Sequence, residues 1–183
     1  ARAVVAQSRT GRVGVIGTRS TIKSGAYERE IRRLNSDLSI FSKACPLLVP
    51  VIEEGWMDKK VTGQILQEYL SEMVREDVDS LVLGCTHYPL LKKAIKDQYP
   101  ELKLIDSSVE TARAVKQQLE ERELLREASE SGPTSGLKTD NGNRGSVRIL
   151  LTDITDHIES LERLFFRHPF QSLEEIQIDD MTR

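Results

Sequence analysis

The sequence predicts an α/β fold in which a parallel sheet carries helices on its faces. Short apolar runs that end at glycine or at a polar residue alternate five times with longer amphipathic stretches. This alternation is typical of parallel sheets whose strands are joined by helical crossovers. The chain has 183 residues, with 38% hydrophobic and 30% charged, which is enough to build the core of one ordinary domain.

The first half of the chain predicts two strands and two helices. RVGVIGT (12–18) is a β-branched run closed by glycine and indicates a buried strand, and a helix is expected over YEREIRRL (27–34). ACPLLVPVIEEG (44–55) is apolar but contains two prolines, which favours a short strand followed by a loop. Residues 57–77 are the clearest helix because their apolar side chains form one stripe. ARAVVAQS (1–8) resembles the end of a helix, so we expect the chain to be part of a longer protein.

Strands and helices continue to alternate in the second half. SLVLGC (80–85) and LKLID (102–106) predict strands. Helices are expected after each of them, at 89–99 and 108–125, the second with Ser108 as its N-cap. Residues 127–146 contain four glycines and four serines and indicate a flexible surface insertion. The remaining expected elements are a strand over 147–153, a helix over 154–165 and an edge strand over 172–179.

The composition argues against several classes of protein. A net charge of −3 gives no electrostatic reason to expect a nucleic acid as partner. No apolar run approaches the roughly 20 residues of a membrane span, and the first residues lack the apolar centre of a secretory signal. The two cysteines, Cys45 and Cys85, form neither a disulfide framework nor a metal-ligand spacing. We therefore expect no membrane, no bound metal and a cytoplasmic location.

Polar residues follow several of the expected strands, and they define a candidate site. In parallel sheets, ligands bind beyond the carboxyl ends of the strands. One cleft is therefore expected to gather residues from several such corners. These corners are Thr18 to Thr21, Glu53, Cys85 to His87, Asp106 to Ser108, and Thr152–Asp153.

The corner in LVLGCTHYPLL (81–91) contains the side chains best suited to catalysis. Cys85 is expected at the end of a strand and just before a helix with Pro89 in its first turn. The free N–H groups of such a turn favour a thiolate and attract anions. His87 could hydrogen-bond the thiol or a substrate carboxylate, and Thr86 offers a hydroxyl. The alternative is that Cys85 is a buried small hydrophobic residue; a zinc site is disfavoured because no second ligand pair has a suitable spacing.

These residues resemble a known family. GCTHYPLL (84–91) is similar to the second cysteine motif of bacterial glutamate racemases, and related aspartate and hydantoin racemases usually differ after its cysteine and threonine. GVIGTRSTIKSGAYEREI, ACPLLVPVIEEG, LKLIDSSVETARAV and ILLTDITDHIESLERLF resemble further segments of the same family. The resemblance covers nearly the whole chain outside 127–146. It implies a parallel-sheet Asp/Glu racemase-like fold of two similar α/β domains, with the active site between them and no cofactor.

The resemblance also implies roles for individual residues. In this family two cysteines stand on opposite sides of the glutamate α-carbon, one removing a proton and the other returning one. Cys85 matches the cysteine that acts on L-glutamate, with Thr86 and His87 in contact with substrate and His87 assisting proton transfer. Glu53 matches a secondary acidic residue, although Glu54 beside it is the alternative. Two further residues, Thr18 and Thr21, match threonines of the substrate pocket, and the alternative for both is helix capping.

The sequence departs from the family in its first half. It holds no aspartate–serine pair near a first glycine-rich strand and no cysteine–asparagine–threonine segment, and Cys45 is expected to be a packed residue. We therefore expect residues 1–105 to form the second domain, and 106–183 to return to an incomplete first domain.

The function that follows is a glutamate racemase, present as a partial chain. The intact form would interconvert L- and D-glutamate to supply D-glutamate for peptidoglycan. It would use no cofactor and could form a homodimer. The chain alone is expected to be inactive. Two alternatives stay open: a non-catalytic α/β module that binds an acidic amino acid or a protein partner, and a related aspartate- or hydantoin-type racemase.

Overall fold

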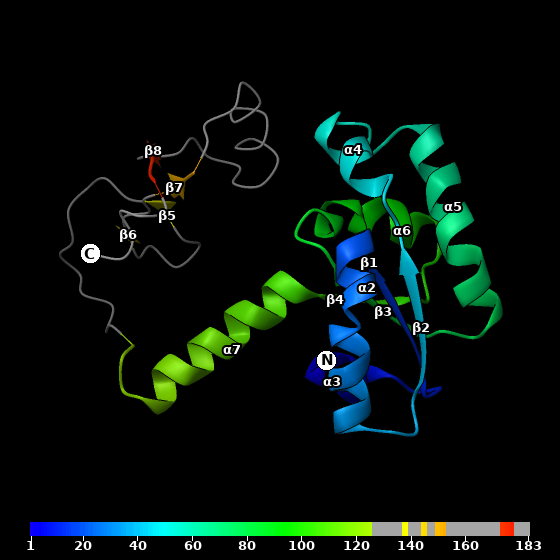
Figure 1. Ribbon diagram of the computed structural model, residues 1–183, viewed down its shortest axis with the longest axis horizontal. Helices are drawn as coiled ribbons and strands as arrows, with labels where there is room; N and C mark the ends of the chain where they lie inside the picture. The colour runs from blue at the N-terminus through cyan, green and yellow to red at the C-terminus, as the bar shows by residue number, and fades with distance from the viewer. Residues whose placement is uncertain (126–136, 139–143, 146–148, 153–172, 178–183) are drawn as a thin grey trace. The chain divides into compact units, whose positions relative to one another are not determined.

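The computed structural model describes residues 1–125, 137–138, 144–145, 149–152 and 173–177. The chain divides into two units, residues 1–123 and 124–183. The first unit contains a four-stranded parallel sheet with the strand order β2-β1-β3-β4, shown in Figure 1. Its strands are β1 (Arg12–Gly17), β2 (Ser39–Ala44), β3 (Ser80–Gly84) and β4 (Lys103–Asp106).

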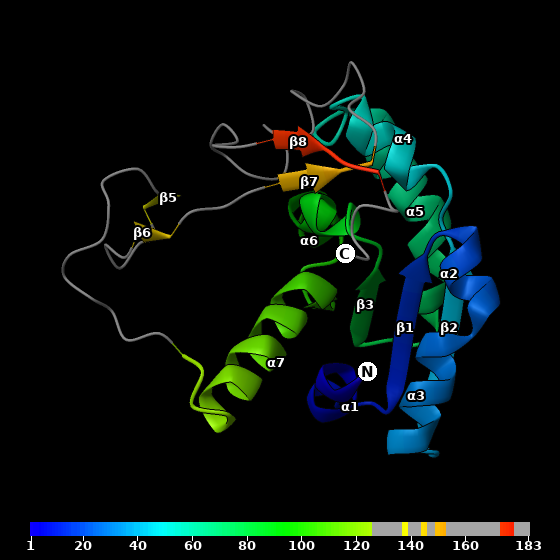
Figure 2. The same ribbon diagram turned by 60° about the vertical axis from the view of Figure 1, so that its left-hand side comes forward.

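Helices cover both faces of this sheet. They are α1 (Arg2–Gln7), α2 (Arg19–Ser24), α3 (Ala26–Leu34), α4 (Leu48–Glu53), α5 (Lys60–Arg75), the 3₁₀ turn η1 (Tyr88–Leu91) and α6 (Lys92–Gln98). The last helix, α7 (Ser107–Glu121), follows β4 and has no buried residue. Side chains of β3 alternate between two cores: Leu81 and Leu83 pack with residues of α4, α5 and α6, whereas Val82 packs with α1 and α3. This period of two explains why α1 and α5 lie on different sides of the sheet (Figure 2).

The register of the strands brings their carboxyl ends to one edge. Gly17 of β1 lies opposite both Ala44 of β2 and Gly84 of β3. Leu83 of β3 lies opposite Asp106 of β4. The residues that follow the last residue of each of the four strands therefore emerge side by side, as the alternation in the sequence predicts for a parallel sheet. The predicted α/β class is confirmed.

In the segment 39–55 one strand was not predicted and one expectation was wrong. The edge strand β2 covers Ser39–Ala44, a segment for which the pattern predicted no strand, because its residues are at most partly buried and include two serines and a lysine among apolar side chains. The segment expected to hold a short strand and a loop instead forms α4 over Leu48–Glu53. Pro50 is tolerated because it lies in the first turn, where the missing N–H would have no partner within the helix.

Only some of the remaining predicted elements lie within the described residues. The predicted helix at 108–125 is present as α7, which shares the unit 1–123 with β4; the expected domain boundary after residue 105 stays a prediction. In the second unit, β7 (Ile149–Leu151) pairs in parallel with β8 (Leu173–Glu175), and β5 (Leu137–Lys138) pairs antiparallel with β6 (Arg144–Gly145). The predicted helix at 154–165 and most of the insertion at 127–146 lie outside the described residues.

Candidate active site

Two glycines allow β1 and β3 to end side by side. A Cβ atom added to Gly84 would lie 2.7 Å from the backbone oxygen of Ile16 and 3.1 Å from a ring carbon of Tyr27. Real Cβ atoms do not approach a backbone oxygen so closely, so position 84 accepts no side chain without a shift of the neighbouring strand. Because Gly17 pairs with Gly84, Thr18 and Cys85 follow at the same level of the sheet edge.

Cys85 opens a short corner between β3 and η1. The corner is closed by backbone hydrogen bonds from the Tyr88 N–H to the Cys85 carbonyl, at 3.3 Å, and from Leu90 to His87, at 3.0 Å. Cys85 is half-buried and Thr86 is exposed. The sulfur of Cys85 lies 3.9 Å from Nδ1 of His87, and Thr86 Oγ1 lies 3.5 Å from the same nitrogen. A thiol, a hydroxyl and an imidazole therefore meet at the end of a buried strand.

Glu53 reaches this corner from α4. Its Oε1 lies 3.1 Å from Nε2 of His87, although the two residues are 34 positions apart in the sequence. Glu54, the alternative that the sequence left open, is the C-cap of α4. The contacts run from the sulfur of Cys85 through both ring nitrogens of His87 to the carboxylate of Glu53. A carboxylate in this position can fix the orientation and the tautomer of the imidazole.

Tyr88 links the corner to Cys45, which lies shortly before the helix that carries Glu53. Its ring is fully buried, and its hydroxyl donates a hydrogen bond of 2.8 Å to the carbonyl of Cys45. Burial raises the pKa of the Tyr88 phenol, which keeps the hydroxyl protonated as a donor.

Thr18, which directly follows β1, and Thr21, on α2, lie at the same edge. Thr18 is the N-cap of α2: its Oγ1 accepts from the Thr21 N–H at 3.3 Å and lies 3.0 Å from the Thr21 hydroxyl. The capping alternative therefore describes the observed contacts of Thr18. The methyl carbon of Thr21 lies 3.0 Å from the place of a Cβ on Gly17 and 3.6 Å from that of one on Gly84. Both threonines are thus neighbours of the strand ends, and their contact with a substrate stays a prediction.

The two cysteines lie in different surroundings. Cys45 is fully buried in the core formed with Leu48 and Tyr88, as the sequence predicts for a packed residue. Burial raises the pKa of its thiol to about 12, because a thiolate there would lose its hydration. Cys45 is therefore unsuited to act as a base near neutral pH.

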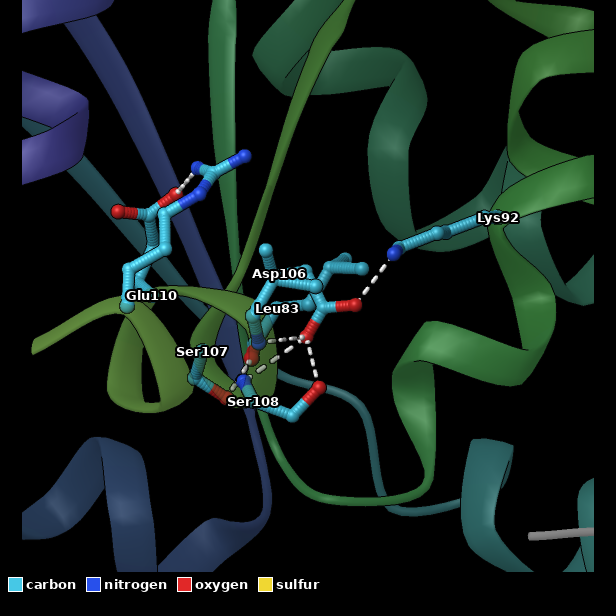
Figure 3. Close-up of polar contacts among 8 residues, drawn as sticks. Leu83, Lys92, Asp106, Ser107, Ser108 and Glu110 are labelled. Atoms are coloured by element: carbon cyan, nitrogen blue, oxygen red, sulfur yellow. Dashed lines mark hydrogen bonds and ion pairs between the residues drawn. The ribbon is translucent and has the colours of Figure 1, made fainter. Parts of the chain in front are cut away.

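The sequence placed one feature of this edge wrongly. The N-cap of α7 is Asp106 and not Ser108: Asp106 Oδ1 accepts from the N–H groups of Ser108, at 2.8 Å, and of Val109, at 3.4 Å. Its second oxygen accepts from the ammonium of Lys92 (Figure 3). Burial alone would raise the pKa of Asp106, but the hydrogen bonds from Lys92 and Ser108 outweigh it and hold the pKa below its usual value. An aspartate directly before a helical pattern was the signal available in the sequence.

The described part of the chain shows no cluster of three or more His, Cys, Asp or Glu side chains suited to a metal ion. Among the same residues, no helix combines the length and the apolar character needed to cross a membrane. Of the last predicted corner, Thr152 belongs to the second unit and Asp153 lies outside the described residues.

Comparison with known proteins identifies the family of the chain. The model of the Asp/Glu/Hydantoin racemase family matches residues 1–115. A glutamate racemase of Geobacter metallireducens is 51% identical over 133 residues, which are 72% of this chain and 49% of the relative. One of Neisseria meningitidis is 34% identical over 178 residues, which are 97% of this chain and 61% of the relative.

A solved structure shows the same fold. The crystal structure of glutamate racemase from Francisella tularensis in complex with D-glutamate superposes with a TM-score of 0.79 at 32% identity, over 98% of this chain and 63% of the other. The chain thus spans about half to three fifths of the length of these relatives. With its parallel sheet, its cysteine corner and these matches, the chain belongs to the Asp/Glu/hydantoin racemase family.

Proposed function

We propose that this chain supplies one side of a glutamate racemase active site, with Cys85 as its acid/base residue. The observation that carries the proposal is the contact series from Cys85 through His87 to Glu53 at the carboxyl edge of the sheet. The glutamate racemases to which the chain is 34–51% identical support glutamate as the substrate.

The proposed chemistry is a proton transfer at the α-carbon. The Cys85 thiolate takes the α-proton of L-glutamate, and a second thiol on the opposite side of the carbon returns a proton. Cys45 does not serve as that thiol, because it is buried and its pKa is raised to about 12. The second group therefore comes from outside these 183 residues. No step calls for a cofactor.

The neighbours of Cys85 have supporting roles in this proposal. His87 assists the transfer of the proton to and from the sulfur, and Glu53 orients the imidazole. Thr86, Thr18 and Thr21 donate hydrogen bonds to the substrate carboxylates. Such donors lower the cost of negative charge developing at the α-carbon, which is a weak acid.

The wider setting follows from the same proposal. The intact protein acts in the cytoplasm, supplies D-glutamate for peptidoglycan and thereby supports the cell wall and cell shape. It assembles as a homodimer, and residues 106–183 return to its first domain. These statements rest on the family, since the chain spans only part of its relatives.

Exchange of the α-proton tests the proposal. L- and D-glutamate are incubated with the chain in heavy water, and loss of the α-proton signal is followed by NMR. We expect exchange of L-glutamate that disappears in Cys85→Ala and persists in the matched variant Cys45→Ala, without formation of D-glutamate by this chain alone. Full racemisation would contradict the role given to a second thiol from outside the chain.

The same samples separate the alternatives. Glutamate that shifts the protein resonances of a folded sample but shows no exchange would identify a non-catalytic binding module. Faster exchange of L-aspartate than of L-glutamate would assign the chain to a related racemase of another acid.

A further inference from the structure

Side chains of the junction between β4 and α7 contact the chain on both sides of the Cys85 corner. Before the corner, the Ser107 hydroxyl donates a hydrogen bond of 3.1 Å to the carbonyl of Leu83, two residues from Cys85. After the corner, the Lys92 ammonium donates to Oδ2 of Asp106. Figure 3 shows both contacts converging on Asp106 and Ser107. The segment that contains Cys85 and His87 is thus held at one end by Ser107, the first residue of α7, and at the other by Asp106, the last residue of β4.

The sheet register explains why these contacts can form. Asp106 is the last residue of β4 and lies directly opposite Leu83 of β3. Lys92 is the first residue of α6, immediately after η1. The chain therefore leaves β3 beside Asp106, turns through the corner and returns to Asp106 at Lys92.

Asp106 is more than a helix cap. Among the described residues it is the only acidic or basic side chain that is buried, with 7% of its surface exposed. Capping α7 uses only Oδ1, and serine or asparagine can serve a cap equally well. Burial of a carboxylate is unfavourable unless the charge has a partner. The partner here is Lys92, on Oδ2, so the charge at position 106 serves the contact with α6.

The next lysine of α6 provides a contrast. Lys93 pairs with Asp97 within α6, at 2.6 Å, and both side chains are more than half exposed. An exposed pair within one helix contributes little and holds no other element in place. Lys92 instead joins two elements across the edge that carries Cys85.

We propose that Asp106, acting through Lys92 and with Ser107, is a positioning residue that holds the corner so that the Cys85 sulfur meets Nδ1 of His87. The proposal rests on the proposed function for its catalytic meaning. Its direct consequence concerns the thiol itself: the influence of His87 on Cys85 depends on the Lys92–Asp106 pair.

Alkylation of Cys85 measures this dependence without any turnover. The rate of reaction with iodoacetamide is measured with and without His87→Gln, in the otherwise unchanged chain and in the Asp106→Asn background, at a temperature where circular dichroism shows every variant folded. Peptide mass spectrometry assigns the modified cysteine. In the unchanged chain we expect His87→Gln to alter the rate about threefold or more, as for residues in contact, and in Asp106→Asn we expect this factor to fall towards one.

Three further variants distinguish positioning from a general loss of stability. Lys92→Met keeps the cap of α7 and should likewise bring the effect of His87→Gln towards a factor of one. It therefore tests the proposal even if Asp106→Asn does not fold. Lys92→Arg should restore the influence of His87, and Lys93→Met should leave it unchanged. An unaltered effect of His87→Gln in Asp106→Asn and Lys92→Met, with only a lower melting temperature, would overturn the proposal. So would the absence of any effect of His87→Gln in the unchanged chain.

This result is independent of the test of the racemase. Loss of the His87 effect in a chain that exchanges no glutamate proton would support positioning and contradict the proposed function. Glutamate exchange that requires Cys85, with the His87 effect intact in Lys92→Met, would do the reverse.

Discussion

At the scale of the residue, the two cysteines are expected to differ sharply in reactivity. Cys45 is fully buried and its pKa is raised to about 12, so about one molecule in ten thousand carries its thiolate at pH 8. Cys85 is half-buried at the end of a strand. Iodoacetamide at pH 8 should therefore modify Cys85 in the folded chain, and both cysteines in urea, as measured by mass spectrometry. Modification of Cys45 at a similar rate in the folded chain would contradict the buried position.

A second residue, Tyr88, offers a test of the contact between the corner and α4. Tyr88→Phe keeps the buried ring and removes the hydrogen bond to the carbonyl of Cys45, which retains the N–H of Leu48 as a donor at 3.2 Å. We expect a loss of about 0.5–1.5 kcal/mol in the free energy of unfolding, measured with urea. Tyr69→Phe is the matched control, because its hydroxyl accepts a longer bond, 3.4 Å, from Leu47 and the loss should be smaller. Equal losses would argue against a special role for Tyr88.

At the scale of the element, the close approach of β1 and β3 depends on Gly84. Gly84→Ala would place a Cβ 2.7 Å from the Ile16 backbone oxygen, and strand backbone cannot move aside easily. We expect a loss of about 1–3 kcal/mol in urea unfolding.

Gly63→Ala in α5 is the matched control for this substitution. Its Cβ would meet only the flexible end of Gln98, at 2.6 Å, and alanine favours a helix interior by about 0.5–1 kcal/mol over glycine. The control should therefore be neutral or stabilising. A stable Gly84→Ala variant would show that the strand ends tolerate wider spacing.

The cap of α7 should make stability depend on pH. The pKa of Asp106 is lowered in the folded chain, so its contribution to stability is complete above the unfolded value of about 4 and is lost as the pH falls through the lower folded value. Melting temperatures measured from pH 7 to pH 2 should fall on the acid side, and fall less in Asp106→Asn. Asp79, whose pKa is also lowered, should keep part of the dependence. An unchanged acid slope in Asp106→Asn would contradict an ionised, hydrogen-bonded carboxylate.

At the scale of the whole molecule, α7 presents an apolar stripe. None of its residues is buried, and Val109 and Val115 are 38% and 52% exposed. Exposed apolar stripes favour association. We expect Val115→Lys to reduce concentration-dependent self-association in sedimentation experiments while changing stability by less than about 0.5 kcal/mol. Gln117→Lys adds the same charge on the same helix and should leave association unchanged; an equal effect would point to net charge instead.

Local patterns in the sequence were sufficient for the fold class and for the chemical content of the site. Buried strands are recognisable in a sequence as short apolar runs. The strands β1, β3 and β4 and the corner at Cys85 could therefore be predicted. The partly exposed β2 could not, because its identity depends on pairing with β1 and not on its own residues. Likewise, α4 was not predicted because its segment contains two prolines. A proline breaks a helix in its interior but is tolerated in its first turn, and the sequence pattern did not show where the helix begins.

The sequence by itself determined which groups are present at the carboxyl edge of the sheet: a thiol, an imidazole, three threonine hydroxyls and a choice of two carboxylates. Only the tertiary structure decided how they pair. Glu53 rather than Glu54 faces His87, and Lys92 faces Asp106, although each of these pairs joins different elements. The physical reason is that covalent order fixes spacing along one element, whereas contacts between elements follow from the sheet register and from helix packing, which depend on the whole core at once.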